Sequence, residues 1–386
     1  MTGVTEHLPA DWRDALLLGR IELPVGPTPV LVRSGRVLDI SAFAATTADA
    51  VATPGLADAP GADLGSLDEM EFVVSWDEGS KGGTHLLSPL DLQCVKASGV
   101  TFAVSAVERV IEERARGDAQ RANDIRAQLA ERVGADLSAV RPGSAEAVKL
   151  KEILIADGLW SQYLEVAIGK DAEIFTKAPV LSSVGWGDFV GVRADSAWNN
   201  PEPEVVILCA ADGRPVGATL GNDVNLRDIE GRSALLLGKA KDNNASAALG
   251  PFVRLFDDGF TMDDVRAAEI SLEVRGTDNF VMSGSSSMSL ISRDPLELIG
   301  QTVGAAHQYP DGFALYLGTM FAPIQDRDAP GQGFTHHPGD RVRVASERLG
   351  VLENTVTTSE QAPPWTLGIS GLMRNLAARG LLGVPA

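Results

Sequence analysis

The sequence predicts an α+β protein with a predominantly β core, a small N-terminal α/β domain and a helical insertion. Short apolar segments separated by Gly, Pro, Asn and Asp run from about residue 172 to residue 357, which is typical of strands joined by turns. Residues 105–131 change to the spacing of a helix. Strands and helices do not alternate regularly, so a doubly wound parallel sheet is not expected.

The N-terminal part of the chain predicts a small domain that we place at residues 1–90, ahead of a catalytic domain at residues 91–386. Residues 15–40 alternate apolar and polar positions between Gly and Pro, which predicts short strands. Residues 53–66 are rich in Gly, Ala, Pro and Asp and predict a loop.

Three further segments predict helices and one predicts a strand pair. We expect helices at residues 105–131 and 144–163, which together make a helical insertion at about residues 105–165. Residues 274–291 predict two strands around a turn. Residues 365–382 predict a closing helix that carries Leu372, Leu376 and Leu382 on its apolar side.

Composition limits the classes of partner and location. The chain has 386 residues, of which 44% are hydrophobic and 22% charged, and no apolar stretch approaches twenty residues, so no membrane partner is expected. The formal net charge of −19 argues against nucleic acid and anionic membrane. Cys94 and Cys209 lie in apolar runs and predict free thiols. Without a recognisable signal peptide, we expect a cytoplasmic location.

A cluster of acidic residues is the main chemical signal. Glu202 and Glu204 begin an apolar run, and residues two apart in a strand point to the same face, so these carboxylates would lie side by side. Asp223 follows at the end of a second apolar segment, and Lys241 comes eighteen residues later. Carboxylate oxygens are the ligands that Mg²⁺ and Mn²⁺ prefer.

Each of these residues also has a structural interpretation without function. Pro201 and Pro203 are compatible with a solvated strand edge, because proline cannot donate to a sheet ladder. Asp223 could be a turn residue, and Arg227 could be its partner in a surface ion pair.

The ordered motif resembles the fumarylacetoacetate hydrolase superfamily. It consists of Glu-x-Glu, then Gly-Asn-Asp-Val-x-x-Arg at residues 221–227, then Lys241 ten residues before Pro251. The resemblance implies a mixed β-sandwich roll and a homodimer or higher homo-oligomer. It also implies a divalent metal, Mg²⁺ or Mn²⁺, held by Glu202, Glu204 and Asp223, with Lys241 as a catalytic amine.

Further segments are similar to the sugar-acid dehydratases of this superfamily. Residues 171–179 resemble the segment ahead of the metal strand, which makes Glu173 a catalytic acid or base and places Lys177 near the substrate. The alternative for Glu173 is an exposed turn. Arg227 is a candidate for binding the substrate carboxylate, with a surface salt bridge as the alternative. Thr319 lies in a turn that resembles the late Gly-Thr turn near the substrate, and an ordinary strand-end hydroxyl is the alternative. Ser105, a further candidate for substrate binding, and Arg109 begin the first helix, where other members place catalytic groups.

One departure narrows the expected reaction. Superfamily hydrolases carry a histidine on the helix after residue 99, but no histidine lies between residues 86 and 306 here, which puts C–C bond hydrolysis in doubt. His336 and His337 in a Gly-rich loop are expected to be exposed polar residues. Residues 157–163 and 333–337 resemble the dehydratase branch that acts on 2-keto-3-deoxy-D-xylonate. The resemblance therefore implies removal of water from a small 2-oxo acid to give 2,5-dioxopentanoate.

Two proton transfers are required for such a dehydration, and Glu173 and Lys241 are the candidates. We expect a nearby cation to lower the pKa of Lys241, and burial to raise the pKa of Glu173. Which residue acts at C3 and which at C4 is left open. Two other functions also stay open: a hydrolase or decarboxylase of a 2,4-dioxo acid, and a binding protein without catalytic activity.

Overall fold

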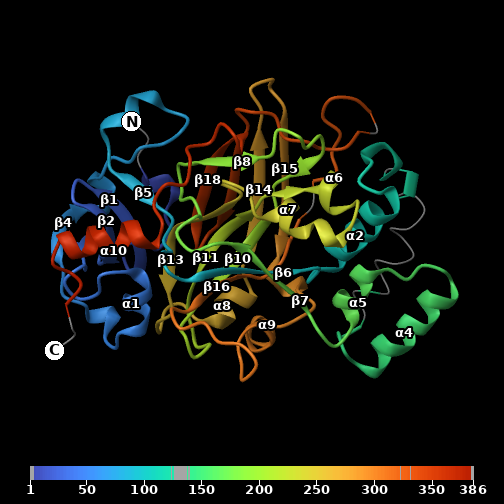
Figure 1. Ribbon diagram of the computed structural model, residues 1–386, viewed down its shortest axis with the longest axis horizontal. Helices are drawn as coiled ribbons and strands as arrows, with labels where there is room; N and C mark the ends of the chain where they lie inside the picture. The colour runs from blue at the N-terminus through green and yellow to red at the C-terminus, as the bar shows by residue number, and fades with distance from the viewer. Residues whose placement is uncertain are drawn as a thin grey trace.

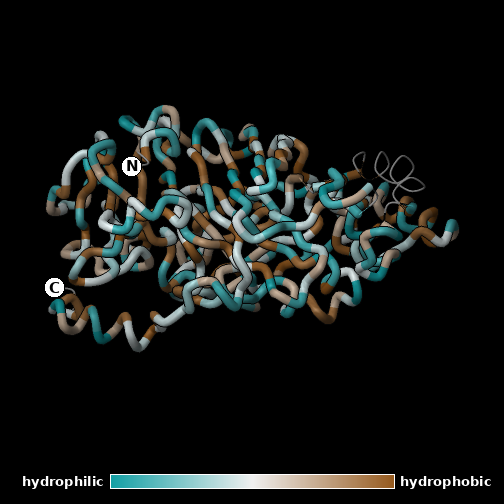
Figure 2. The backbone as a smooth tube through the Cα atoms, turned by 90° about the horizontal axis from the view of Figure 1, so that it is seen from above, coloured by the Kyte–Doolittle hydropathy of each residue, from teal (hydrophilic) through white to brown (hydrophobic). Residues whose placement is uncertain are grey.

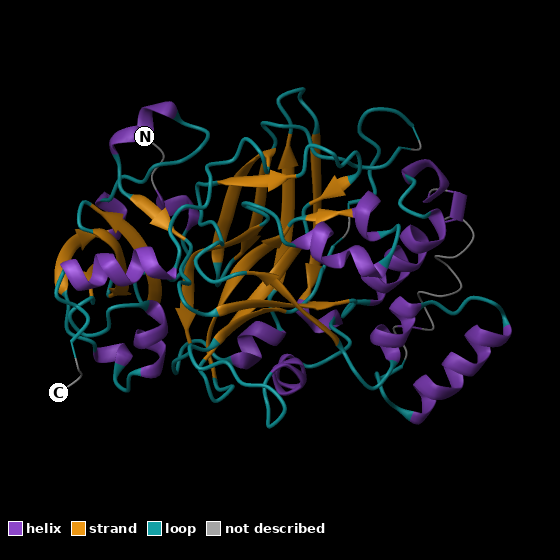
Figure 3. Cartoon of the chain, viewed as in Figure 1, coloured by secondary structure: helices purple, strands orange, loops and turns teal. Residues whose placement is uncertain are grey.

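Two β-sheets form the centre of the protein, and helices lie around them (Figure 1). The computed structural model describes residues 4–122, 124–125, 137, 140–321, 323–330 and 332–383. Figure 3 shows strands in the middle and at the end that holds the termini, with helices at both ends of the molecule. The predicted α+β class with a predominantly β core is confirmed.

The larger sheet has eleven strands in the described part of the chain, and it runs through most of the molecule. Its order is β4-β3-β2-β1-β13-β11-β10-β16-β6-β7, with β5 paired to β1. The strands are β1 (Leu17–Leu23), β2 (Gly26–Arg33), β3 (Arg36–Asp39), β4 (Ala62–Ser66), β5 (His85–Leu87), β6 (Cys94–Gly99), β7 (Glu173–Ala178), β10 (Pro203–Cys209), β11 (Pro215–Asp223), β13 (Ala247–Leu255) and β16 (Phe313–Tyr316).

A second sheet of five strands has the order β15-β14-β17-β18-β8, and β9 pairs with β12 in a short ribbon. The predicted strand pair at residues 274–291 corresponds to β14 and β15. The bounds are β8 (Phe189–Val192), β14 (Glu269–Arg275), β15 (Val281–Ser287), β17 (Arg341–Ser346), β18 (Gly350–Thr358), β9 (Asn199–Asn200) and β12 (Asn225–Leu226).

The helices lie at the two ends of the molecule and beside the sheets (Figure 1). Their bounds are α1 (Thr47–Ala52), α2 (Ala103–Ala115), α4 (Ala145–Ala156), α5 (Gln162–Ile168), α6 (Arg227–Glu230), α7 (Leu237–Lys241), α8 (Met262–Arg266), α9 (Pro295–Thr302) and α10 (Ile369–Ala378). None of these described helices is long and apolar enough to span a bilayer.

The N-terminal strands are joined to the core rather than separate from it. Strand β1 pairs with β13, so the predicted N-terminal domain continues the larger sheet. Helix α10 returns from the end of the chain to this unit, where Asn375 donates to the carbonyl oxygen of Val25 at 2.7 Å and Arg379 to that of Pro27 at 2.8 Å. Figure 2 shows both termini at one end of the elongated molecule. The domain boundary near residue 90 stays a prediction.

Several predicted boundaries differ from the structure. The predicted loop at residues 53–66 contains strand β4, which pairs with β3. The first predicted helix ends at Ala115, because Arg116 adopts a left-handed conformation (φ 55°) and Gly117 follows it; residues 126–131 of that prediction lie outside the described residues. The second predicted helix is interrupted between Ala156 and Gln162. Leu382 lies after α10 and is exposed, whereas Leu372 and Leu376 are buried.

Strand β11 depends on close packing at Gly221, which faces the aromatic ring of Tyr316. A methyl group at this position would lie 2.3 Å from the Tyr316 ring and 2.7 Å from Val206. The Tyr316 ring is fully buried, and its hydroxyl donates to the carbonyl oxygen of Ala248 at 2.7 Å, so the ring is held at its far end. Glycine is therefore required here for space.

We predict that Gly221→Ala lowers the free energy of unfolding by about 1–3 kcal/mol, because the added methyl overpacks the core. The matched control is Gly300→Ala in α9, where no atom lies within 4 Å of the added methyl; it should be neutral or stabilise by up to about 1 kcal/mol. Urea unfolding of both variants measures the difference. Equal midpoints would contradict the packing argument.

Candidate active site

Two neighbouring strands, β10 and β11, bring three carboxylates together. In the antiparallel ladder, Pro203 lies opposite Asn222 and Glu204 lies opposite Gly221. The amide of Asp223 donates to the carbonyl oxygen of Glu202 at 3.0 Å, so these two residues face each other just beyond the ladder. One carboxylate oxygen of each of Glu202, Glu204 and Asp223 lies within 4.8 Å of the others.

The three carboxylates are buried. Glu202, Glu204 and Asp223 are each at most 2% exposed. Strand β10 lies between β11 and β16, so the alternative of a solvated strand edge is wrong. Pro203 is tolerated because it is the first residue of its strand. Buried like charges repel strongly, so this arrangement requires positive charge close by.

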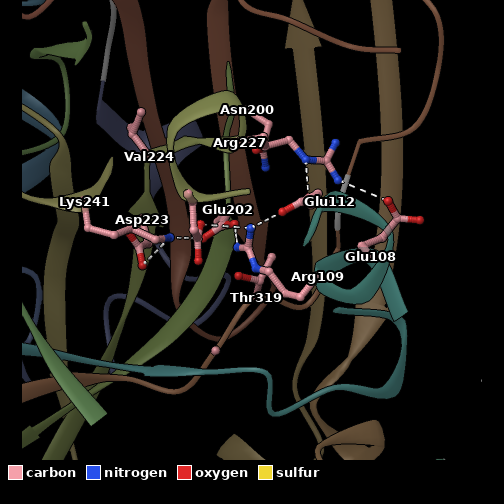
Figure 4. A network of polar contacts seen from close by, with 12 residues as sticks. Glu108, Arg109, Glu112, Asn200, Glu202, Asp223, Val224, Arg227, Lys241 and Thr319 are labelled. Carbon is pink, nitrogen blue, oxygen red and sulfur yellow. Dashed lines mark hydrogen bonds and ion pairs between the residues drawn. The ribbon is translucent and has the colours of Figure 1, made fainter. Parts of the chain in front are cut away.

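Three cationic side chains meet these carboxylates, and Figure 4 shows two of them, Lys241 and Arg109. Lys241, the last residue of α7, donates to Glu202 and to Asp223, the latter at 3.1 Å. Lys177 of β7 lies 2.7 Å from the Oδ1 atom of Asp223. Arg109 of α2 donates to the Oε1 atom of Glu202. The sequence-predicted residues Glu202, Glu204, Asp223 and Lys241 are thus brought into one site.

Glu204 is held by the turn that follows β16. The amide of Gly318 donates to Glu204 at 2.7 Å, and the hydroxyl of Thr319 at 3.4 Å. Gly318 has a left-handed φ of 109°, and a Cβ there would lie 1.9 Å from the hydroxyl of Thr101. Glu202, Glu204 and Asp223 are called the triad below. The Gly-Thr pair predicted to approach the substrate therefore contacts a carboxylate of the triad.

Burial and neighbouring charge set the protonation of the site. Burial raises the pKa of Glu202, but Lys241 and Arg109 outweigh it and lower the pKa to about 2. Burial together with Asp223 and Glu202 raises the pKa of Glu204 well above its ordinary value. Burial lowers the pKa of Lys241, but Asp223, Glu202 and Glu230 raise it above that of an ordinary lysine. These carboxylates raise the pKa of Lys241, whereas a bound cation is expected to lower it.

Glu173 begins strand β7 and lines the same cavity as the triad. Its position in a strand beside Gly99 excludes the exposed-turn alternative. Burial raises the pKa of Glu173 above its ordinary value, although Arg109 and Lys241 oppose the change. This is the direction predicted from the sequence, and it favours a protonated carboxyl group that can donate.

The cavity above the triad is small. Its free volume is about 10 Å³, which is about the space of one water molecule. The lining residues come from both strands of the triad, from β6 and β7, and from the surrounding helices: Ser98, Gly99, Val100, Arg109, Glu173, Phe175, Glu202, Glu204, Asp223, Glu230, Lys241 and Thr319. Larger cavities of about 350 and 670 Å³ lie elsewhere, and none of the predicted site residues lines them.

Three of the predicted substrate-binding residues do not line this cavity. Lys177 is fully buried behind Asp223 and also donates to the carbonyl oxygens of Val224 at 3.1 Å and Lys241 at 2.6 Å. Arg227 is 2% exposed and pairs with Glu112 and Glu108, so it is neither a surface partner nor a cavity residue. Ser105 is buried in α2 outside the lining.

Two charged lining residues, Arg109 and Glu230, were not among the predicted site residues. Arg109 begins the helix where, by the resemblance, other members carry catalytic groups, and the resemblance gives no role to Glu230. Glu230 follows Arg227 by three positions in α6, a spacing that places side chains on one side of a helix. That spacing is the signal that could have pointed to it. Glu230 lies 3.0 Å from Arg109, and burial raises its pKa to about 7.

The two adjacent histidines differ from the prediction of exposed polar residues. His336 is 6% exposed, and its Nδ1 atom lies 3.2 Å from Asp340. Burial lowers the pKa of His336. His337 is more exposed and lies near Asp328 and Asp278. Cys94 and Cys209 are both free thiols, as predicted.

The donor set fits a hard divalent cation. Three carboxylate oxygens converge from rigid strands, which is the ligand type and number that Mg²⁺ or Mn²⁺ accepts while keeping positions for substrate. The raised pKa of Glu204 reflects the crowding of negative charge at this point. A cation bound among the three carboxylates would relieve that repulsion.

The chain is similar to known sugar-acid dehydratases. It is 32% identical over 196 residues to a probable 2-keto-3-deoxyxylonate dehydratase of Haloferax volcanii, covering 51% of this chain and 64% of the relative. It is 31% identical over 183 residues to the 2-dehydro-3-deoxy-D-arabinonate dehydratase of Saccharolobus solfataricus, covering 47% of this chain and 57% of the relative. The matches therefore span about three fifths of those proteins. No protein-family model matches the chain.

Solved structures confirm the fold. The apo form of 2-keto-3-deoxy-D-arabinonate dehydratase aligns with a TM-score of 0.60 at 20% identity, over 89% of this chain and 99% of that one. Its complex with magnesium and 2,5-dioxopentanoate aligns with a TM-score of 0.58 at 19% identity over the same shares. The resemblance recognised in the sequence is thus confirmed by similar relatives and by a shared fold.

The raised pKa of Glu230 leads to a prediction for stability. A carboxyl group whose pKa is higher in the folded state binds more protons there than when unfolded, so stability falls as pH rises between the two values. The interval runs from the ordinary value of 4.5 to about 7. We predict that the free energy of unfolding of metal-free wild-type protein falls by roughly 3 kcal/mol more than that of Glu230→Gln as pH rises over this interval, at 1.36 kcal/mol per pH unit.

Urea unfolding at pH 4.5, 5.5, 6.5 and 7.5 in the presence of EDTA measures this difference. Glu269→Gln, an exposed residue at the start of β14, is the matched control and should keep the wild-type pH dependence. Parallel curves for wild type and Glu230→Gln would contradict the prediction.

Proposed function

We propose that this protein is a divalent-metal-dependent dehydratase of a 2-keto-3-deoxy sugar acid. The observation that carries the proposal is the buried convergence of Glu202, Glu204 and Asp223 with Lys241 in contact with two of them. Within this class we propose 2-keto-3-deoxy-D-xylonate as the substrate and 2,5-dioxopentanoate as the product.

The similar proteins support the reaction class. Two relatives are named dehydratases of 2-keto-3-deoxy pentonates, and a solved structure with the same fold is a complex of such an enzyme with magnesium and 2,5-dioxopentanoate. We extend from those proteins to this chain because its own residues supply an oxygen ligand set and two proton-transferring groups in one cavity.

The metal ligands and Lys241 have separate roles in the proposed reaction. A divalent cation held by Glu202, Glu204 and Asp223 supplies a Lewis acid for the keto group of the substrate. Lys241 touches Glu202 and Asp223, so its amine is the group beside C2 and C3 of a substrate whose oxo-acid end faces the triad. We assign removal of the C3 proton to Lys241. The carboxylates that raise the pKa of Lys241 are the proposed metal ligands, so a bound divalent cation would offset their charge, lower this pKa and let the amine act as a base.

Glu173 is assigned to the other proton transfer. Burial raises its pKa, which favours the acid form relative to an ordinary glutamate, and it reaches the cavity from β7, outside the triad. Glu173 would protonate the C4 hydroxyl, which leaves as water while the C3–H electrons form the C3–C4 double bond. Loss of a C5 proton and addition of a proton at C3 then move the double bond to C4–C5. The resulting enol takes up a proton at C4 and loses its hydroxyl proton, which gives the C5 aldehyde.

The two alternatives have less support. A hydrolase would need a group that activates water, and the described residues that line the cavity include neither histidine nor cysteine. A binding protein would have no use for a carboxyl group of raised pKa that lines the same cavity as a buried lysine and three carboxylates. Further proposals are Mg²⁺ as the physiological metal, with Mn²⁺ as a substitute, a homodimer or larger homo-oligomer, and a cytoplasmic location.

The first test of the proposal is metal-dependent turnover. We predict that protein stripped with EDTA is inactive and that Mg²⁺ restores formation of 2,5-dioxopentanoate from 2-keto-3-deoxy-D-xylonate. Glu202→Gln and Asp223→Asn should bind Mg²⁺ at least about 100-fold more weakly and stay inactive, because each removes a charged oxygen ligand. Calorimetry measures binding, and NMR measures the product.

Glu146→Gln in α4 is the matched control, because Glu146 is exposed and lies outside the site. It should bind Mg²⁺ and turn over normally. Restored activity of Glu202→Gln with Mg²⁺ would contradict the ligand assignment. Rapid cleavage of an acylpyruvate in place of dehydration would favour the hydrolase.

The second test separates the two proton transfers. We predict that Lys241→Met binds Mg²⁺ but loses exchange of the C3 protons of the substrate in D₂O. Glu173→Gln should keep this exchange and lose water elimination by roughly 10²- to 10⁴-fold, since only the acid is removed. Proton NMR of the substrate follows both events. Exchange that persists in Lys241→Met and stops in Glu173→Gln would reverse the assignment.

A further inference from the structure

The acid end of an anionic substrate needs positive charge, and few side chains can provide it. Among the described residues that line the cavity, Arg109 and Lys241 are the cations. Lys241 lies against Glu202 and Asp223. Lys177 and Arg227, which the sequence suggested for this role, are enclosed by their own buried partners. Arg109 is therefore the cation available for substrate binding.

The guanidinium group of Arg109 is held at one side and reaches the triad with the other (Figure 4). Its Nη1 atom lies 2.7 Å from Glu112 and 3.0 Å from Glu230, and its Nη2 atom donates to Glu202. The side chain is 7% exposed. Glu112 and Glu230 thus fix the orientation of the group, while Nη2 points among the carboxylates proposed to bind the metal.

Glu202 cannot bind the guanidinium of Arg109 and a divalent cation equally well. A divalent cation carries twice the charge of a guanidinium and binds carboxylate oxygen at a shorter distance, so it attracts Glu202 more strongly. When the triad binds a cation, the hydrogen bond from Nη2 to Glu202 is weakened. Nη2 is then free for another anion, and Glu112 and Glu230 still hold Nη1 in place.

The size of the cavity supports this rearrangement. A volume of about 10 Å³ does not admit a five-carbon acid. Since Glu202, Glu204 and Asp223 are fixed at the ends of β10 and β11, the space must come from the longer side chains that line the cavity. Arg109 approaches from α2, outside the larger sheet, so it can withdraw without disturbing the ladder.

We propose that Arg109 is the specificity residue that binds the carboxylate of the substrate, after metal binding releases it from Glu202. With Nη1 held by Glu112 and Glu230, the charged Nη2 donates to an oxygen of the substrate carboxylate in a charge-assisted hydrogen bond. The inference rests on the proposed function only for the class of ligand, which is a 2-oxo carboxylate. It assigns a positioning contact and no proton transfer to Arg109.

The test compares a 2-oxo acid with its neutral amide on Mg²⁺-loaded protein. Pyruvate and pyruvamide both offer two oxygens to the metal, but only pyruvate has the carboxylate that pairs with Arg109. Calorimetry of wild-type protein should give a preference for pyruvate, and Arg109→Gln should reduce this preference by about 10- to 100-fold, the range of a lost charge-assisted pair. Arg116→Gln, an exposed residue at the end of the same helix, is the matched control and should keep the preference.

Metal binding gives a second readout that a purely structural role would not produce. Because Arg109 competes for Glu202, Arg109→Gln should bind Mg²⁺ at least as tightly as wild type, and up to about 10-fold more tightly. Weaker Mg²⁺ binding would overturn the competition. An unchanged preference for pyruvate over pyruvamide would overturn the carboxylate contact.

Arg109→Lys covers the case in which the glutamine variant does not fold, because it keeps the positive charge beside Glu112 and Glu230. It should bind Mg²⁺ normally and lose about 10-fold of the preference for pyruvate, since a compact lysine amine that pairs with Glu112 and Glu230 lacks the second nitrogen that reaches the substrate. An undiminished preference would overturn the proposal. These binding results do not depend on turnover: if wild-type protein binds pyruvate through Arg109 but does not dehydrate the sugar acid, the proposed function fails and the inference stands.

Discussion

The repulsion among three buried carboxylates is the constraint on which the structure of the site depends. Glu202 and Glu204 come from one strand and Asp223 from its neighbour, so the ladder between β10 and β11 fixes their spacing. Negative charge at this density in a buried place is costly unless cations lie close. Lys241 comes from α7 and Arg109 from α2, so two separate helices supply the positive charge that the carboxylates require.

The parts of the fold and site that follow local rules could be predicted from the sequence. The alternation of a strand placed Glu202 and Glu204 on one face, and the ordered motif that includes Asp223 and Lys241 was specific enough to indicate the fold. The β core followed from short apolar segments between turn residues. Local patterns suffice here because each inference concerns residues near one another in the chain or a motif of fixed order.

The parts that depend on tertiary contacts could not be predicted. Arg109 meets Glu202 across 93 positions of sequence, and nothing near either residue indicates this pairing. Lys177 looked suitable for substrate binding, but β7 places it behind Asp223. Strand β4 was taken for a loop because its composition is typical of turns, and it is a strand because β3 lies beside it. In each case a partner distant in the sequence decided the outcome.

The return of α10 to the first strands has a consequence for how the chain is made. Strand β1 finds partners in β2 and in β13, and α10 closes on the loop and strand at residues 25–27. A ribosome releases residues 369–378 long after residues 17–33. The beginning of the chain therefore emerges without its later neighbours, and contacts of such large sequence separation form slowly. Until α10 has been synthesised, the carbonyl oxygens of Val25 and Pro27 lack the hydrogen bonds that Asn375 and Arg379 donate in the folded protein.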